Sequence, residues 1–153
     1  MISLSKKYLT TIEDLSEDEI RYLISQAIEF KTKSDNGNNN QILAGKTLAL
    51  MFEKPSTRTR LSFEAAMFQL GGNTIYLNAN DLQLSRGESI QDTAKTISLY
   101  VDCLVSRVHS HNTIIELSQN CKIPLINGLS DLYHPCQSLA DLMTILEYKK
   151  SFK

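Results

Sequence analysis

Three hydroxyl groups and two arginines lie together in one short run, Ser56-Thr57-Arg58-Thr59-Arg60. The run follows an apolar segment, Lys46–Phe52, that is typical of a buried strand, and it precedes apolar residues at helical spacing. Arginines in the first turn of a helix face the positive end of the helix dipole, so they cost stability there. They are accounted for if an anion lies between the guanidinium groups and the free backbone N–H groups of that turn. The pattern therefore predicts a phosphate cradle at the start of the helix.

The alternative for this run is an ordinary capped helix in which Arg60 pairs with Glu64, four residues further on. Exposed pairs of this kind contribute only about 0.3–0.5 kcal/mol to stability. The alternative accounts for Arg60 but leaves Arg58 and the neighbouring hydroxyls unexplained. The anion site is the interpretation that covers the whole run.

Strand and helix signals alternate along the rest of the chain. Short apolar runs predict four strands, over Lys46–Phe52, Asn73–Leu77, Cys103–Arg107 and Pro124–Asn127. Apolar residues at helical spacing predict helices that begin near Thr57, Ser89, Asn112 and His134, after an earlier helix that a capping box starts at Ser16. This alternation indicates right-handed βαβ units and an α/β fold, an open parallel four-stranded sheet with helices on both faces.

Polar residues follow each predicted strand, where an open parallel sheet binds its ligands. The Ser56–Arg60 run follows the first strand, and Gln83 lies in the long polar loop after the second. Arg107 ends the third strand, while His134 and Gln137 follow the fourth. These residues are expected at one edge of the sheet and in one site. The loop that carries Gln83 is either functional or a mobile surface segment.

The side chains at this edge could act on an anion that also contains a carbonyl group. The Arg107 guanidinium could neutralise a phosphoryl group or a carbonyl oxygen that becomes an oxyanion. The His134 ring N–H could polarise a C=O bond, and Gln137 could accept from an amide NH₂. The ordinary alternatives are a surface arginine at a strand end and a histidine that only caps a helix.

Composition narrows the class of protein. The chain has 153 residues, 42% hydrophobic content and a net charge of −1, as expected for one globular domain without nucleic acid as its main partner. No apolar run approaches the about 20 residues that span a bilayer. The N-terminus carries neither a signal core nor a transit pattern, so no membrane partner is expected.

The cysteines could form disulfides, and the cysteines and histidines could bind a metal. Three cysteines are an odd number, which favours reduced thiols and a cytoplasmic location. His109 and His111 with Cys103 or Cys121 suggest a zinc alternative, but no CxxC or HExxH spacing supports it. No metal is expected.

Two motifs together resemble the aspartate/ornithine carbamoyltransferase family. They are the stretch Phe52–Glu64 and the stretch His134–Gln137 with Leu139–Leu142 after it. Within that family, Gln83–Ser89 and Ile126–Asp131 are similar to the ornithine-using members. The aspartate-using members usually carry lysines where Gln83 stands here.

The resemblance implies a role for each matching residue and no cofactor. The residues that it assigns to binding of carbamoyl phosphate are Ser56, Thr57, Arg58, Thr59, Gln83, Arg107, His134, Pro135, Cys136 and Gln137. Arg58, Arg107 and His134 would be catalytic, with Arg107 between the phosphate and the carbonyl oxygen. His134 would contact that oxygen, and Gln137 would bind the carbamoyl nitrogen.

The resemblance also implies partners outside this chain. Residues 1–153 would form the carbamoyl-phosphate-binding domain, and the family's second domain, which binds ornithine, is absent from this chain, so the chain alone is expected to be inactive. A homotrimer is implied in which the Gln83 loop reaches the neighbouring subunit's site. The alternatives are a carbamoyltransferase for putrescine, acylornithine or aspartate, and a non-catalytic phosphate-binding or trimerisation module. Arginine biosynthesis and citrulline breakdown both remain open as pathways.

Overall fold

A five-stranded parallel sheet lies at the centre of the chain, with the strand order β1-β5-β4-β2-β3. The computed structural model describes residues 4–35 and 41–151. The strands are β1 (Tyr8–Leu9), β2 (Thr47–Phe52), β3 (Asn73–Asn78), β4 (Cys103–Arg107) and β5 (Leu125–Leu129). The α/β class and the parallel sheet are those predicted from the alternation of strand and helix signals. Strand β2 lies between β4 and β3, and it is apolar and buried from Leu48 to Phe52.

The prediction of four strands was wrong, because β1 adds a fifth at the edge of the sheet. Tyr8 and Leu9 pair with Leu125 and Ile126 of β5. The Tyr8 hydroxyl also donates to the Cys121 carbonyl at 2.8 Å. Two residues are too few to show the alternation by which a strand is recognised. This strand exists because β5, far along the chain, offers an open edge.

Five α-helices and three short 3₁₀ turns connect the strands within the described residues. They are α1 (Glu17–Asp35), α2 (Thr57–Gln69), α3 (Ile90–Ile97), α4 (His111–Asn120), α5 (Pro135–Lys149), η1 (Ile12–Asp14), η2 (Ala79–Asp81) and η3 (Gln83–Arg86). Serine side chains accept from first-turn N–H groups at Ser56, Ser89 and Ser110, so three of the four helices predicted after the sheet begins have a side-chain cap. The fourth, α5, follows His134 without one. The predicted capping box at Ser16 is present, since Ser16 N donates to Glu19 Oε2 at 2.8 Å and Glu19 N to Ser16 Oγ at 3.3 Å. No helix in the described part of the chain is long and apolar enough to cross a membrane.

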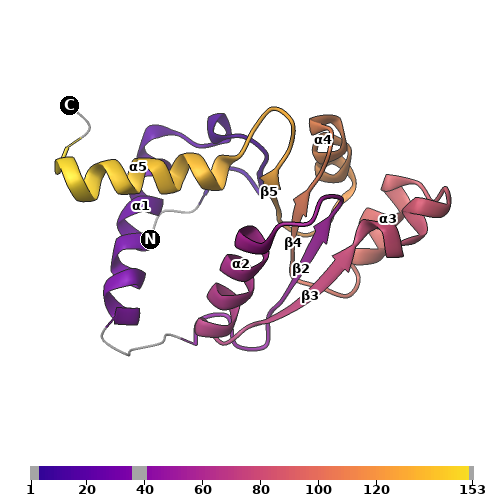
Figure 1. Cartoon of the computed structure of the whole chain (residues 1–153), viewed down its shortest axis with the longest axis horizontal. Helices are drawn as coiled ribbons and strands as arrows, with labels where there is room; N and C mark the ends of the chain where they lie inside the picture. The colour runs from indigo at the N-terminus through magenta and orange to yellow at the C-terminus, as the bar shows by residue number, and fades with distance from the viewer. Residues whose placement is uncertain (1–3, 36–40, 152–153) are drawn as a thin grey trace.

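Helices cover both faces of the sheet, as Figure 1 shows. On one face, Ala49 and Met51 of β2 pack with the buried residues of α3 and α4. On the other face, Leu50 and Phe52 of the same strand pack with Met67 of α2. Alternate residues of a strand point to opposite faces, so one apolar strand supplies both cores.

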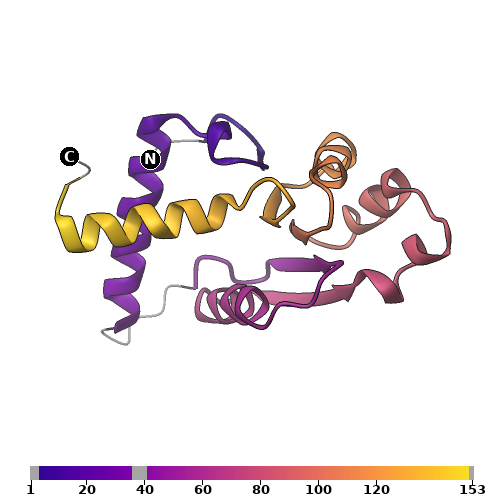
Figure 2. The ribbon, with the colours of Figure 1, turned by 45° about the horizontal axis from the view of Figure 1, so that its top comes forward.

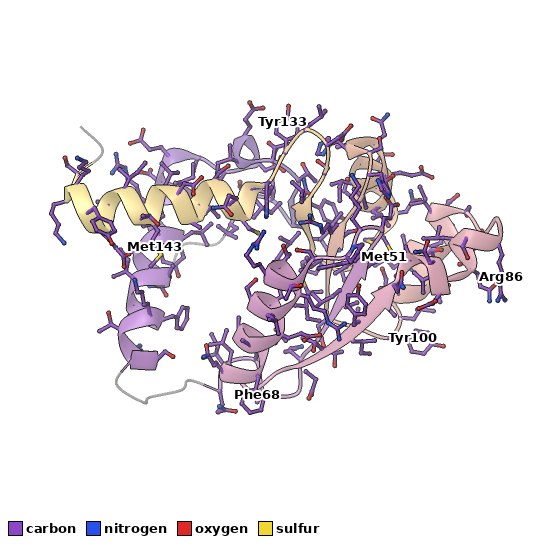
Figure 3. The ribbon with its side chains drawn as sticks, viewed as in Figure 1. Met51, Phe68, Arg86, Tyr100, Tyr133 and Met143 are labelled. Carbon is purple, nitrogen blue, oxygen red and sulfur yellow. The ribbon has the colours of Figure 1, made fainter. Side chains whose placement is uncertain are left out.

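The helices α1 and α5 cross one another at the end of the molecule away from α3 (Figure 2). Met143 of α5 points toward α1 in Figure 3, where it lines the same crevice as Leu23 and Ile24. Lys31 and Glu147 join the two helices through a salt bridge of 2.8 Å. This pair joins the C-terminal halves of the two helices.

The carboxyl ends of three strands meet beside the start of α2. Phe52 pairs with Asn78 on one side and with Arg107 on the other. The pairing of β4 with β5 shifts register between Ser106 and Arg107, so that Arg107 stands opposite Leu129. The shift is an irregularity of the bulge type, which bends a strand and redirects a side chain.

Candidate anion-binding site

A cleft of about 620 Å³ opens between α2, the end of β4 and the start of α5. Its lining residues are Ser56, Arg58, Thr59, Ser62, Phe63, Ala66, Arg107, His134, Cys136, Gln137 and Ala140. The cleft therefore joins side chains that follow the first, third and fourth predicted strands, as the rule for parallel sheets predicted.

Hydroxyl groups at the start of α2 form a connected row that ends at Arg107. Ser56 Oγ donates to Thr59 Oγ1 at 3.0 Å and accepts from the backbone N–H of Thr59 at 3.4 Å. Arg107 Nη1 donates to Thr59 Oγ1 at 3.4 Å. The first turn of α2 contains no acidic residue, so its positive dipole end is left without a neutralising side chain. An anion is the group that this end of the helix would bind.

The two arginines of the predicted cradle point to different sides of α2. Arg60 Nε pairs with Glu64 Oε1 at 2.9 Å, and the guanidinium carbon lies 3.9 Å from the centroid of the Tyr76 ring. The i,i+4 pair considered as the alternative is therefore present for Arg60. Arg58 lines the cleft and has no hydrogen-bond or ion-pair partner among the described residues. The two guanidinium groups at the cleft are those of Arg58 and Arg107, not those of Arg58 and Arg60.

Backbone contacts hold the Arg107 end of β4 against the loop that leads into α2. Glu53 N donates to the Arg107 carbonyl at 2.8 Å, and His109 N donates to Glu53 Oε2 at 2.5 Å. Arg107 is consequently fixed at its backbone on the same loop that carries Ser56.

Two buried nitrogen atoms in the cleft have no partner within the described residues, Arg107 Nε and His134 Nδ1. A buried polar atom without a partner typically costs about 1–3 kcal/mol. Burial first, and the Arg107 charge second, lower the pKa of the His134 imidazole below its usual 6.5. The neutral ring keeps one N–H and one lone pair at neutral pH. The Arg107 Nε–H and the N–H of the His134 ring can both donate to oxygen atoms of a ligand in the cleft.

The start of α5 contributes Gln137 and Cys136 to the cleft. Gln137 Nε2 donates to Asp141 Oδ1 at 2.8 Å, which directs the donating end of this amide toward its own helix. Burial raises the pKa of the Cys136 thiol to about 11, so it is neutral at physiological pH and unsuited to nucleophilic attack. Pro135 is fully buried at the first position of α5 and does not line the cleft.

Comparison with known proteins identifies the family. Residues 7–147 match the family model described as "Aspartate/ornithine carbamoyltransferase, carbamoyl-P binding domain". The chain belongs to this family. It is 52% identical to an ornithine carbamoyltransferase of Anoxybacillus flavithermus over 148 residues. These residues are 97% of this chain and 47% of that protein. Against an ornithine carbamoyltransferase of Bacillus subtilis the identity is 52% over 151 residues, covering 99% of this chain and 46% of that protein.

The fold agrees with solved structures of the same family. Ornithine carbamoyltransferase from Pyrococcus furiosus superposes with a TM-score of 0.95 at 49% sequence identity, covering 100% of this chain and 49% of that chain. The chain thus spans about half the length of the relatives it matches.

Three residues that the family resemblance assigned to the site, Pro135 among them, do not line the cleft of this chain. Thr57 is exposed and lines a shallower pocket on the Arg60 side of α2. Gln83 is exposed in η3, at the end of the molecule opposite to α1 and α5. Arg86, in the same turn, projects outward there in Figure 3. The segment between β3 and α3 forms the turns η2 and η3 rather than an irregular loop.

Sequence reasoning missed four residues that line the cleft: Ser62, Phe63, Ala66 and Ala140. The first three follow Thr59 at intervals of three, four and seven, which place them on the same helix face. Ala140 follows Gln137 at the same kind of interval. The spacing was therefore sufficient to find them once Thr59 and Gln137 had been chosen.

One of the two histidines in the zinc alternative, His111, makes contacts within the protein. His111 Nδ1 lies 3.0 Å from Ser130 Oγ, and its ring packs edge-on against Tyr133. Within residues 4–35 and 41–151, no three His, Cys, Asp or Glu side chains gather as a metal site.

The pH dependence of His134 can be measured directly, because the chain has only three histidines. We expect the folded His134 pKa to lie below 6.5, so the unfolded chain binds more protons between the two values. The free energy of unfolding should then fall as pH falls from 6.5 toward the folded pKa, and His134→Gln should flatten that slope. Imidazole NMR titration and denaturant unfolding at several pH values measure both effects. A folded pKa at or above 6.5 would contradict the geometry.

Proposed function

We propose that this chain supplies the carbamoyl-phosphate half-site of an ornithine carbamoyltransferase. One cleft brings together a hydroxyl row, the Arg58 side chain and two buried nitrogen atoms, and neither Arg58 nor these nitrogens have a partner among the described residues. This observation carries the proposal. The family model and the relatives at 52% identity support the same substrate. The positive charge and the hydrogen-bond donors of this cleft match the phosphate and carbonyl oxygens of an acyl phosphate.

The phosphate group would lie against the start of α2, where Arg58 and the hydroxyl row can donate to its oxygens. Arg107 would lie between the phosphate and the carbonyl oxygen, since it reaches Thr59 on one side and approaches His134 on the other. The neutral His134 ring would donate its N–H to the carbonyl oxygen. The Gln137 amide oxygen would accept from the carbamoyl NH₂ group.

In the reaction, the neutral δ-amine of ornithine would attack the carbamoyl carbon and form a tetrahedral intermediate. Negative charge develops on the former carbonyl oxygen, where Arg107 and His134 would stabilise it. The C–O bond to phosphate then breaks, phosphate takes the electron pair, and the new C–N bond gives citrulline after loss of a proton from nitrogen. Loss of one such oxyanion donor typically costs about 2.7–4 kcal/mol in the barrier.

The ornithine-binding residues are proposed to lie outside this chain. None of the residues that line the cleft is a carboxylate, so nothing in the lining pairs with the ornithine ammonium group. The matching relatives are about twice as long as this chain. We therefore expect this polypeptide alone to bind carbamoyl phosphate without forming citrulline. Citrulline formation by the unaided 153-residue chain would contradict this part of the proposal.

A homotrimer and a cytoplasmic location complete the proposal. Gln83 is exposed and remote from the cleft of its own chain, which supports its use in a neighbouring subunit's site. Its replacement by alanine should weaken binding only at concentrations where light scattering detects a trimer. All three cysteines are free, as in a reducing compartment.

Calorimetric titration with freshly prepared carbamoyl phosphate, with inorganic phosphate in parallel, tests the proposal. Saturable heat with carbamoyl phosphate, and tighter binding than phosphate alone, is the expected result because His134 and Gln137 contact only the carbamoyl part. Equal affinity for the two would favour a plain phosphate-binding module. No heat from either would overturn the half-site.

A further inference from the structure

The segment Ile126–Asp131 resembles the family, yet the proposed chemistry uses none of its residues. It forms the end of β5 and the loop that leads to His134. We propose that Asn127 and Ser130, together with His111, are positioning residues that hold this loop and thereby place the His134 imidazole beside Arg107. The catalytic consequence rests on the proposed function, whereas the positioning itself does not.

Asn127 is fully buried and uses both ends of its side-chain amide. Its Nδ2 donates to the Thr10 carbonyl at 2.9 Å and to the Tyr133 carbonyl at 3.1 Å. Its Oδ1 accepts from the Leu129 N–H at 3.0 Å. One side chain thus joins the N-terminal segment, the end of β5 and the residue just before His134.

The Leu129 backbone shows that this loop is held in a special conformation. Its φ of 154° is one that residues with a Cβ rarely adopt. Such a conformation persists where surrounding contacts determine it, and the Asn127 contact to Leu129 N–H is one of them.

Ser130 closes the loop on the other side of the turn. Its backbone N–H donates to the Tyr133 carbonyl at 3.0 Å, and its Oγ accepts from the Tyr133 N–H at 3.2 Å. Both backbone groups of Tyr133 are therefore occupied, and Tyr133 is directly bonded to His134. Figure 3 shows Tyr133 on this loop, ahead of α5.

His111 ties the closed loop to α4. Its Nδ1 lies 3.0 Å from Ser130 Oγ, and its ring centroid lies 4.9 Å from that of Tyr133 at an interplanar angle of 67°. The backbone N–H of His111 also donates to Asp131 Oδ1 at 2.6 Å. The loop is consequently held from a second, separate element of the fold.

His134 depends on this support because its own ring is not anchored. Its Nδ1 has no partner among the described residues, and its side chain makes no capping bond to α5. The backbone just ahead of it is what sets the position of the ring. If the loop is released, the imidazole can turn toward water, away from burial and from the Arg107 charge.

The test compares Ser130→Ala with Ser130→Thr, which keeps the hydroxyl, and with Ser98→Ala as a matched control. Ser98 also accepts a backbone N–H and donates to a backbone carbonyl, at 3.1 and 2.7 Å, but it lies at the end of α3 on the other face of the sheet. The first measurement is the His134 pKa by imidazole NMR without ligand. The second is the ratio of the dissociation constants for inorganic phosphate and carbamoyl phosphate.

In Ser130→Ala, we expect the His134 pKa to rise toward 6.5 and the preference for carbamoyl phosphate to fall about 2- to 10-fold, as for one lost hydrogen bond. Ser130→Thr should restore both values. Ser98→Ala should lower the melting temperature and leave the His134 pKa and the ligand preference unchanged. If Ser130 only stabilised the fold, Ser130→Ala would behave in the same way as Ser98→Ala.

If Ser130→Ala does not fold, His111→Leu removes the same contact to Ser130 Oγ and should shift the His134 pKa in the same direction. An unchanged His134 pKa in a folded variant would overturn the proposal. Because the pKa is measured without ligand, a chain that shows the shift but binds no carbamoyl phosphate would refute only the proposed function.

Discussion

Replacement of Arg107 by glutamine should weaken the binding of both inorganic phosphate and carbamoyl phosphate by about 100-fold or more. The guanidinium reaches Thr59 at 3.4 Å and approaches His134, so its loss removes charge from the middle of the cleft. The substitution should also raise the His134 pKa, because a positive neighbour that opposes protonation is gone. Calorimetry and imidazole NMR measure the two effects.

The same substitution should leave the fold intact. Arg107 Nε is buried and has no partner in the part of the chain that the structure describes, so the protein gains little stability from the guanidinium in the absence of ligand. We expect the melting temperature of Arg107→Gln to be unchanged or higher. The matched variant His134→Gln should lose preference for carbamoyl phosphate and keep its affinity for inorganic phosphate. Normal phosphate affinity in Arg107→Gln would show that this arginine does not face the anion.

Arg58→Ala should weaken carbamoyl-phosphate binding about 10- to 100-fold, the usual loss for one hydrogen-bonded charge. Arg58 lines the cleft, and its guanidinium is unpaired within the described residues, so an oxyanion would be its first partner. The affinity should fall in parallel for inorganic phosphate, since this end of the cleft would contact only the phosphate group. Calorimetric titration of both ligands measures the loss.

Arg60→Ala is the matched control for that experiment, two residues away on the same helix. Its guanidinium is held by Glu64 and by the Tyr76 ring on the other side of α2. We expect affinity within about twofold of the unsubstituted chain and a small loss of stability, because the ion pair with Glu64 lies at the surface. Equal losses of affinity in Arg58→Ala and Arg60→Ala would mean that charge, rather than position in the cleft, governs binding.

The local sequence pattern determined which segments are strands and helices and where the polar residues stand between them. The helix starts near Thr57 and Ser89 were predictable, and in both a serine cap acts on N–H groups within the next turn. Strand β4 was bounded correctly by its run of apolar residues. These signals depend on neighbours within a few residues, so they are present in the sequence before any tertiary contact forms.

Long-range contacts decided the rest. Strand β1 has two residues and is a strand only because β5 pairs with it. The run Ser56–Arg60 was interpreted as one anion site between Arg58 and Arg60, but residues two apart lie on different sides of a helix. The packing of α2 against β4 and α5 determines that Arg58 meets the cleft. The support of His134 by Asn127 and His111 likewise joins residues from β5 and α4, whose proximity is set by the sheet. Sequence alone therefore determined the chemical groups and the elements that carry them, and the tertiary structure decided which of those groups face one another, because side-chain direction depends on contacts between distant segments.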